Sequence, residues 1–114
     1  MKETELICND DGSIFHLRLR PGEAAKKIIL VGDPGRVDMI GKHLDNIRVK
    51  RNNREFFTLT GSYKNKEISI MSSGIGTDNI DILLNELDAI FNYDLESGKE
   101  LKEKTSLSIV RLGT

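Results

Sequence analysis

The segment Gly32–Arg36 is the part of this chain whose residue types are best suited to bind an anion. It follows the apolar run Ile28–Val31, a pattern typical of a buried strand that ends in a tight turn. Glycine lets a ligand approach the backbone closely, and Pro34 favours the start of a helix. We therefore expect free backbone N–H groups, a helix N-terminus and the Arg36 guanidinium to form a cradle for an anion. Ordinary strand–turn–helix junctions contain the same residues, so this segment alone does not decide the function.

Two further predicted strands end in residues that suit the same chemistry. Ser73–Gly76 is a glycine turn after the predicted strand 67–72, and Arg111–Thr114 follows the apolar run 106–110. Because ligands of α/β sheets bind beyond the carboxyl ends of strands, we expect the three strand ends to share one site. The groups expected to hold an anion there are Gly32, Arg36, Arg111 and Thr114.

Arg54 is a further candidate cation, at the start of a predicted strand. It is close in sequence to Arg48 and Arg51, and the three also fit a solvated strand edge. Arg111 is harder to assign to the surface, because it follows an apolar strand and buried arginines are nearly always paired. We expect Arg111 to belong to the site and leave both interpretations open for Arg54.

The histidines and the cysteine indicate little catalytic chemistry. His16 stands between two apolar residues, where a structural role is more common than a catalytic one, and His43 is expected at the surface. The single cysteine, Cys8, excludes a disulfide framework and a cysteine metal cluster, and we expect it to be inert. The sequence contains no recognisable catalytic triad, paired carboxylates or metal-ligand cluster, so no catalytic acid, base or nucleophile is assigned.

The composition is typical of a globular domain. The 114 residues are 31% charged and 38% hydrophobic, and 17 basic against 18 acidic residues give a net charge of −1. This balance argues against a nucleic-acid binder, which usually carries a basic excess. No apolar run approaches the roughly 18 residues that span a membrane, and the N-terminus lacks a signal-peptide pattern. We expect a cytoplasmic protein with no nucleic-acid or membrane partner.

The elements that must position the candidate residues alternate between strands and helices, which predicts an α/β fold with a mixed central sheet. The sequence predicts a short extended piece at 14–17, strands at 26–31, 47–50, 55–62, 67–72 and 106–110, and helices at 34–44 and 78–91. The strands 55–62 and 67–72 are expected to form a hairpin.

The last quarter of the chain gives a different pattern. Residues 92–105 are charged and lack an apolar face, so we expect an exposed insertion with some helix at 100–104. The apolar run that follows is interpreted as a core strand, after which the chain ends. Because a strand–helix–strand series usually continues, we expect residues 1–114 to be the N-terminal part of a larger domain, apparently truncated.

Four motifs together resemble the bacterial hexameric nucleoside phosphorylases, and the uridine phosphorylases most of all. They are, in order, Gly32–Arg36, Arg54–Phe56, Ser72–Gly76 and Arg111–Thr114, and the resemblance runs from about residue 15 to 114. It implies the N-terminal part of a three-layer αβα phosphorylase fold. Residues 60–64 also resemble the purine enzymes, which leaves the nucleoside open between uridine and others.

This resemblance implies a pentosyltransferase with inorganic phosphate as co-substrate. Phosphate attacks the anomeric carbon of a nucleoside and releases the base and ribose 1-phosphate. Arginines and N–H donors position phosphate without protonating it, and its charge stabilises the oxocarbenium-like transition state. The implied phosphate ligands are Gly32, Arg36, Arg54, Arg111 and Thr114, and the implied ribose contacts are His16, Ile75 and Thr114. Arg54 and His16 would act across a subunit interface, with His16 on the ribose 5′-hydroxyl.

The resemblance also implies self-association as a dimer or hexamer. In some uridine phosphorylases a monovalent cation such as K⁺ is bound at the dimer interface, at positions matched by Glu55, Ile75 and Asn79. Asn79 replaces the usual serine, which puts this cation site in question. No other cofactor is implied.

Two other functions fit part of the pattern. A nucleosidase of the same fold uses water and is expected to lack the phosphate arginines, whereas Arg36, Arg54 and Arg111 are all present. A non-catalytic phosphate- or nucleotide-binding fragment would fold stably as it stands. The base-recognition residues of the family lie beyond the point where this chain ends. We therefore expect these 114 residues to carry the phosphate half of the site and to be nearly inactive alone.

Overall fold

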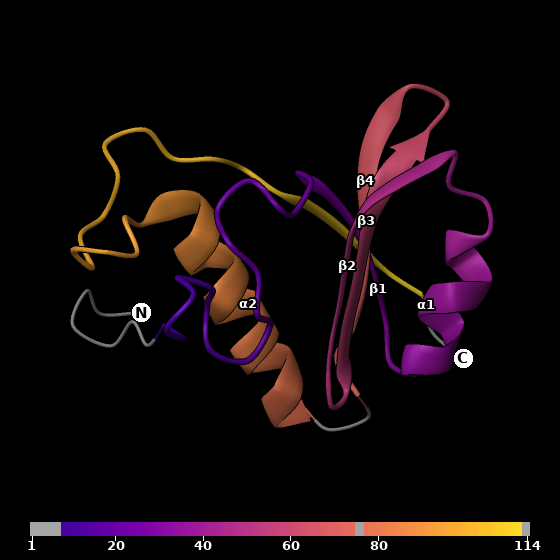
Figure 1. Ribbon diagram of the computed structural model, residues 1–114, viewed down its shortest axis with the longest axis horizontal. Coiled ribbons are helices and arrows are strands. Elements are labelled where there is room, and N and C mark those ends of the chain that lie inside the picture. The colour runs from indigo at the N-terminus through magenta and orange to yellow at the C-terminus, as the bar shows by residue number, and fades with distance from the viewer. Residues whose placement is uncertain (1–7, 75–76, 113–114) are drawn as a thin grey trace.

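A five-stranded mixed sheet lies between two helical layers, as Figure 1 shows. The computed structural model describes residues 8–74 and 77–112. In chain order the elements are β1 (Lys27–Val31), α1 (Pro34–Gly41), β2 (Asn46–Asn53), β3 (Phe56–Tyr63), β4 (Lys66–Ser72), α2 (Thr77–Asn92) and β5 (Ser108–Arg111). The predicted α/β class and mixed sheet are confirmed.

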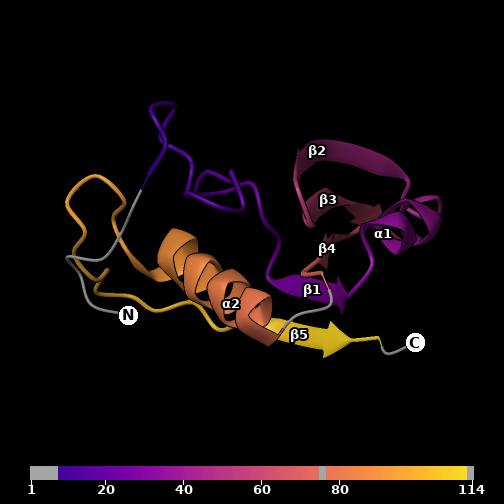
Figure 2. The ribbon, with the colours of Figure 1, turned by 90° about the horizontal axis from the view of Figure 1, so that it is seen from below.

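The order of the strands decides where a site can form. The sheet runs β2-β3-β4-β1-β5, with β1 parallel to both β4 and β5. Figure 2 shows β1 and β5 side by side and pointing the same way. The carboxyl ends of β4, β1 and β5 therefore lie side by side at the same end of the sheet.

Two-residue turns connect the antiparallel strands. Lys64 and Asn65 join β3 to β4 with φ values of 50° and 66°, the backbone expected of a type I′ turn that matches strand twist. The predicted hairpin is therefore confirmed. Arg54 and Glu55 join β2 to β3, and β2 begins at Asn46 and is longer than the four residues expected.

Helix α1 covers one face of the sheet. Its buried Val37 packs with Phe57, Leu59 and Ile70 from the strands. The helix ends at Gly41, three residues earlier than expected, where an added Cβ would lie 2.5 Å from the Leu59 side chain. Met39 of the same helix points away from the core, since its side chain is 64% exposed.

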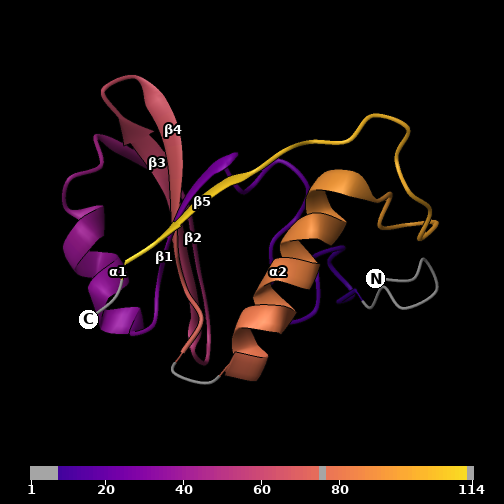
Figure 3. The ribbon, with the colours of Figure 1, turned by 180° about the vertical axis from the view of Figure 1, so that it is seen from behind.

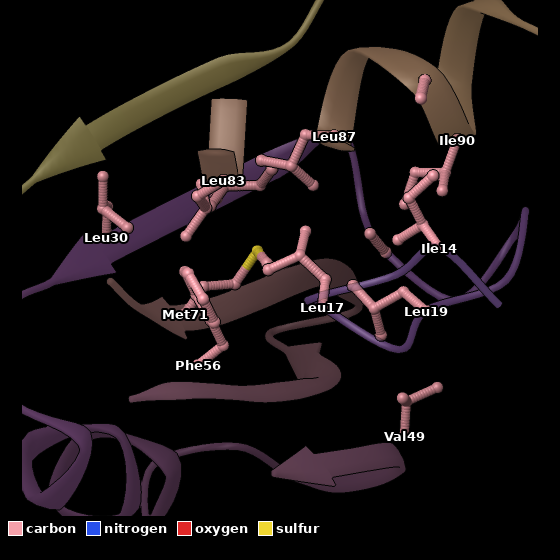
Figure 4. Close-up of a cluster of buried hydrophobic side chains, with 13 residues drawn as sticks. Ile14, Leu17, Leu19, Leu30, Val49, Phe56, Met71, Leu83, Leu87 and Ile90 are labelled. Carbon is pink, nitrogen blue, oxygen red and sulfur yellow. The ribbon is translucent and has the colours of Figure 1, made fainter. Parts of the chain in front are cut away.

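Helix α2 and the N-terminal segment cover the opposite face, and Figure 3 shows them to the right of the sheet, with α1 to its left. The core on this side is drawn in Figure 4. The side chains that meet there come from α2, the sheet and the N-terminal segment, and include Leu83, Leu87, Ile90, Leu30, Phe56, Met71, Ile14, Leu17 and Leu19. This packing brings residues 14–19 against α2, about 70 positions later in the chain.

Three local predictions are wrong. Residues 14–17 form a turn instead of an extended piece, because the Arg18 N–H donates to the Ile14 carbonyl at 2.9 Å. No helix forms at 100–104, where Glu100 pairs with Tyr93 in an isolated bridge. Strand β5 is an exposed edge strand of the described sheet instead of a core strand.

Residues 92–105 are largely exposed, as expected, and Asn92, the first residue of the segment, forms hydrogen bonds with Leu101 and with Thr105 at its other end. The Asn92 side-chain oxygen accepts from the Thr105 N–H at 2.6 Å, and its carbonyl accepts from the Leu101 N–H at 2.8 Å. These bonds close the segment into a loop that leads directly into β5.

Candidate functional site

The chain segments after β4 and β5 are both tied to the end of β1. The Ser73 N–H donates to the Val31 carbonyl at 3.0 Å, and the Leu112 N–H donates to the Leu30 carbonyl at 2.9 Å. The three strand ends identified in the sequence therefore adjoin one another. β1 lies between β4 and β5, so Gly32, which directly follows β1, begins between the ends of these two strands.

The start of α1 differs from the expected cradle. Asp33 is the N-cap, and its carboxylate accepts from the Gly35 N–H at 2.9 Å while its carbonyl accepts from the Arg36 N–H at 3.0 Å. The expectation that these backbone donors are free is wrong, because the cap already uses both. Gly32 and Arg36, whose side chain is half-buried, are the other residues of this segment whose chemistry suits an anion.

Arg111 stands at the end of β5, opposite Leu30 of β1 in the register of the sheet. The expectation of a buried, paired arginine is wrong, since Arg111 is exposed and forms no ion pair with any described residue. β5 lies at the edge of the described sheet, which keeps this guanidinium in solvent. Two neighbouring parallel strands thus carry three of the candidates: Gly32 and Arg36 follow β1, and Arg111 is the last residue of β5. Thr114 lies outside the described residues.

A second group of predicted residues surrounds a cavity of about 330 Å³. The cavity is lined by Phe15, His16, Arg18, Asn53, Arg54, Glu55, Phe56, Asn79 and Ile82. The structure therefore gathers four candidates, His16, Arg54, Glu55 and Asn79, from three separate parts of the chain. The fifth candidate of this group, Ile75, lies outside the described residues.

Arg54 projects from the turn between β2 and β3 with a φ of 56°. L-residues with a side chain rarely adopt this left-handed backbone, and it is more frequent where function requires it. Arg54 is exposed and has no ion-pair partner among the described residues. Arg48 and Arg51, in contrast, pair with Glu67 and Glu23, so the strand-edge interpretation holds for those two.

Gly74 connects the two groups of residues. Its φ is 77°, and an added Cβ would lie 3.0 Å from the Glu55 Cβ and 3.1 Å from the Asn79 amide nitrogen. On the other side, its carbonyl oxygen is 3.5 Å from where a Cβ of Gly32 would be. Only glycine fits this backbone. Because Gly74 is near Glu55 and Asn79 on one side and near Gly32 on the other, the two groups of candidate residues are neighbours.

Glu86 of α2 is a site residue that the sequence prediction missed. It is 8% exposed and accepts from the backbone N–H groups of His16 and Leu17 at 2.9 and 2.8 Å. Its other oxygen lies 2.6 Å from His16 Nδ1. The signal was present in the sequence, because Glu86 stands three residues after Leu83 and four before Ile90, on the apolar face of the helix.

The remaining candidate groups offer less chemistry. His43 is exposed, as expected. Burial, and then the Glu86 carboxylate, raise the pKa of the Cys8 thiol, which favours its unreactive protonated form. Within the described residues, no cluster of three or more His, Cys, Asp or Glu side chains is placed to bind a metal. No helix in this part of the chain is long and apolar enough to cross a membrane.

The chain is an α/β protein with glycine turns and arginines at the carboxyl ends of neighbouring parallel strands, which is where α/β sheets commonly bind ligands. Residues 26–96 match the family model of the phosphorylase superfamily, and the chain belongs to this family. The four sequence motifs and the fold thus lead to the same assignment.

The curated relatives include both branches of this family. The chain is 40% identical over 81 residues to uridine phosphorylase of Thermococcus kodakarensis, which covers 71% of this chain and 29% of that protein. It is 39% identical over 77 residues to the DeoD-type 1 purine nucleoside phosphorylase of Shewanella oneidensis, covering 67% of this chain and 33% of that protein. The chain therefore spans about a third of the length of the relatives it matches.

A solved structure agrees with this assignment. The nucleoside phosphorylase of Trypanosoma brucei, described as showing uridine phosphorylase activity, superposes with a TM-score of 0.86 at 39% identity. The superposition covers 96% of this chain and 38% of that one. The fold is that of the nucleoside phosphorylases, and the expected fold is confirmed.

Proposed function

We propose that this chain is part of a nucleoside phosphorylase that cleaves uridine, or a related nucleoside, with inorganic phosphate. The observation that carries the proposal is the parallel register of β1 and β5. In this register, Gly32 and Arg36 follow the carboxyl end of β1, and Arg111 is at the carboxyl end of β5 beside it. The similarity to uridine phosphorylase over most of the chain supports uridine, although the purine relatives are nearly as similar.

In the proposed reaction, a phosphate oxygen forms a bond to the anomeric carbon while the bond from that carbon to the base nitrogen breaks. The electron pair leaves with the base, which takes up a proton, and ribose 1-phosphate remains. Guanidinium groups suit this step because they hold a phosphate dianion through fixed donors and do not give up a proton. Positioned phosphate also stabilises the positive charge that develops on the sugar.

This chain would supply the phosphate half of the site. Arg36 and Arg111 would bind phosphate, with Gly32 allowing its close approach, and Thr114 belongs to the same proposal on the resemblance alone. The second group would serve a neighbouring copy of the chain, with Arg54 reaching its phosphate and His16 the ribose 5′-hydroxyl. Ile75 would line the ribose pocket. This division requires self-association, which we propose as a dimer or hexamer in the cytoplasm, acting in nucleoside salvage.

A monovalent cation such as K⁺ belongs to the same proposal. Glu55 and Asn79 flank Gly74 and offer a carboxylate and an amide oxygen, the oxygen ligands that hard cations prefer. Glu55 forms no ion pair with a described residue, so its charge is not already neutralised by a neighbour. The carbonyl of Ile75 would be the third ligand.

The product of the reaction distinguishes the proposal from its alternatives. The experiment incubates the protein with uridine, and separately with inosine, with and without phosphate, and identifies the sugar released. Ribose 1-phosphate formed only with phosphate supports a phosphorylase, and free ribose formed without phosphate indicates a nucleosidase. We expect slow turnover from these 114 residues alone, because they span about a third of the relatives' length. Rapid turnover by this chain would show that the division of the site is wrong.

A further inference from the structure

His16 is held in one orientation by contacts on all its polar groups except one. Its backbone N–H and ring Nδ1 both face the Glu86 carboxylate, and its carbonyl accepts from the Asn53 side-chain amide at 2.8 Å. The rings of Phe15 and Phe56 meet the imidazole edge-to-face, with centroids 4.7 and 6.0 Å away. No hydrogen bond from the described residues reaches Nε2, and the His16 side chain, 39% exposed, lines the 330 Å³ cavity.

The Glu86 carboxylate determines which ring nitrogen carries the proton. An ionised carboxylate only accepts hydrogen bonds, and three donors converge on it: the N–H groups of His16 and Leu17 and the imidazole. The 2.6 Å contact to Nδ1 therefore requires a proton on Nδ1. In the neutral ring, Nε2 is then left as an acceptor.

We propose that Glu86 is a positioning residue that fixes the proton of His16 on Nδ1, so that Nε2 accepts a hydrogen bond from a ligand hydroxyl in the cavity. The identity of that hydroxyl, the ribose 5′-hydroxyl, rests on the proposed function. An acceptor nitrogen pairs with a hydroxyl, which can donate, and repels the lone pairs of an ether oxygen, which cannot. The cavity would therefore select a free hydroxyl at this position over its methyl ether.

A purely structural role for Glu86 is the alternative, since its carboxylate also caps the turn at residues 14–18. Glu86→Gln separates the two roles. The amide oxygen of glutamine can still accept from the backbone N–H groups of His16 and Leu17. Its NH₂ group, however, would donate to Nδ1 and force the ring proton onto Nε2. Asp81→Asn is the matched control, because Asp81 is an exposed acid of the same helix.

The first measurement is nitrogen-15 NMR of the imidazole, recorded at a pH where the spectrum itself shows a neutral ring. The chain has two histidines, so His43→Gln leaves His16 as the single signal. We expect the proton on Nδ1 in the unaltered protein and in Asp81→Asn, and on Nε2 in Glu86→Gln. A proton on Nε2 in the unaltered protein would overturn the inference. That spectrum decides the question even if the Gln variant fails to fold, and an unchanged tautomer in a folded Gln variant would also overturn it.

The second measurement compares kcat/KM for uridine and for 5′-O-methyluridine. Glu86→Gln should lower the ratio of kcat/KM for uridine to kcat/KM for 5′-O-methyluridine by about fivefold, the effect expected when one hydrogen bond is lost. A merely structural role would lower both values together and leave their ratio unchanged, which would overturn the hydroxyl selection. These rates are measured on the complete enzyme that we propose contains this chain, because we expect only slow turnover from the 114 residues alone. If that enzyme cleaves neither nucleoside, the proposed function fails, whereas the NMR result still tests the role of Glu86.

Discussion

The Ser72 hydroxyl donates a hydrogen bond of 2.6 Å to the carbonyl oxygen of Glu55, and so ties the end of β4 to the turn that carries Arg54. The same hydroxyl accepts from the Phe57 N–H at 2.9 Å. Ser72 is completely buried, so these two backbone groups depend on it for their hydrogen bonds. The turn that positions Arg54 is therefore held by the strand end that leads to Gly74.

Ser72→Ala should lower the free energy of unfolding by about 1–3 kcal/mol, because it removes the partner of the buried Phe57 N–H and of the half-buried Glu55 carbonyl. Urea unfolding of the two proteins measures the difference. Ser106→Ala, at an exposed position, is the control and should change stability by no more than about 0.5 kcal/mol. Equal effects of the two substitutions would contradict the role assigned to Ser72.

Gly61 of β3 tests a steric requirement of the sheet. A Cβ added there would overlap the carbonyl oxygen of Asn46 on the neighbouring strand and lie 3.2 Å from Leu44. Because backbone cannot move aside cheaply, Gly61→Ala should cost at least about 2 kcal/mol in thermal or urea unfolding. Gly32→Ala is the contrasting variant, since its added methyl would meet only an ordinary contact at 3.5 Å. If Gly61→Ala were as stable as the unaltered protein, β2 and β3 would be packed less closely than the structure indicates.

Arg54 tests whether the left-handed turn is maintained for function. Glycine adopts this backbone without the steric cost, whereas Arg54→Ala retains that cost and removes the same guanidinium. We expect Arg54→Gly to be more stable than Arg54→Ala by about 0.5–1 kcal/mol in urea unfolding. Phosphorolysis by the proposed oligomer of the complete enzyme should fall equally in both variants. A more stable Ala variant would mean that the turn does not hold this conformation.

The ion pair between Arg48 and Glu67 predicts a pH-dependent contribution to stability. Two hydrogen bonds of 2.8 Å from Arg48 lower the pKa of Glu67. A carboxyl with a depressed pKa in the folded state stabilises the protein fully above its unfolded pKa, and this stabilisation is lost as pH falls through the lower folded pKa. Both side chains are nearly half exposed, so solvent screening limits the effect to about 0.5 kcal/mol.

The measurement is the stability difference between the unaltered protein and Glu67→Gln as a function of pH. The difference should be present at pH 7 and disappear below the pKa of folded Glu67. Glu103→Gln, at an exposed position that forms no ion pair with another described residue, should show no such trend. A difference that grows toward acidic pH would contradict the sign of the predicted effect.

The elements with regular patterns could be predicted from the sequence, because their signals are local. β1 follows from its apolar run, and the hairpin of β3 and β4 follows from strand-forming residues on either side of the Lys64–Asn65 turn. The prediction for residues 14–17 was wrong because the turn is stabilised by Glu86, about 70 positions later. β5 was predicted as a core strand on its apolar residues alone, which do not tell an edge strand from a central one.

The part of the candidate site that lies at the ends of strands could be predicted from the sequence. The proximity of the strand ends that carry Gly32, Arg36 and Arg111 was predictable, because the carboxyl ends of neighbouring parallel strands lie side by side. The capping of the α1 donors by Asp33 was missed, because the sequence showed a helix start but not which groups would satisfy it. Glu86 was missed for a different reason: an acid on an apolar helix face shows that a partner exists, but not that it is His16.

Phosphate binding by this chain tests the central claim most directly, and thermal unfolding with increasing phosphate at constant ionic strength measures it. Ligand at ten times its Kd stabilises a folded protein by about 1.4 kcal/mol, so Tm should rise steadily through the millimolar range. Arg111→Ala should fold normally, because Arg111 is exposed and unpaired among the described residues, and should lose most of the rise. Gly32→Ala should weaken it as well. An unchanged Tm in phosphate, or an equal rise in Arg111→Ala, would contradict the proposed phosphate site.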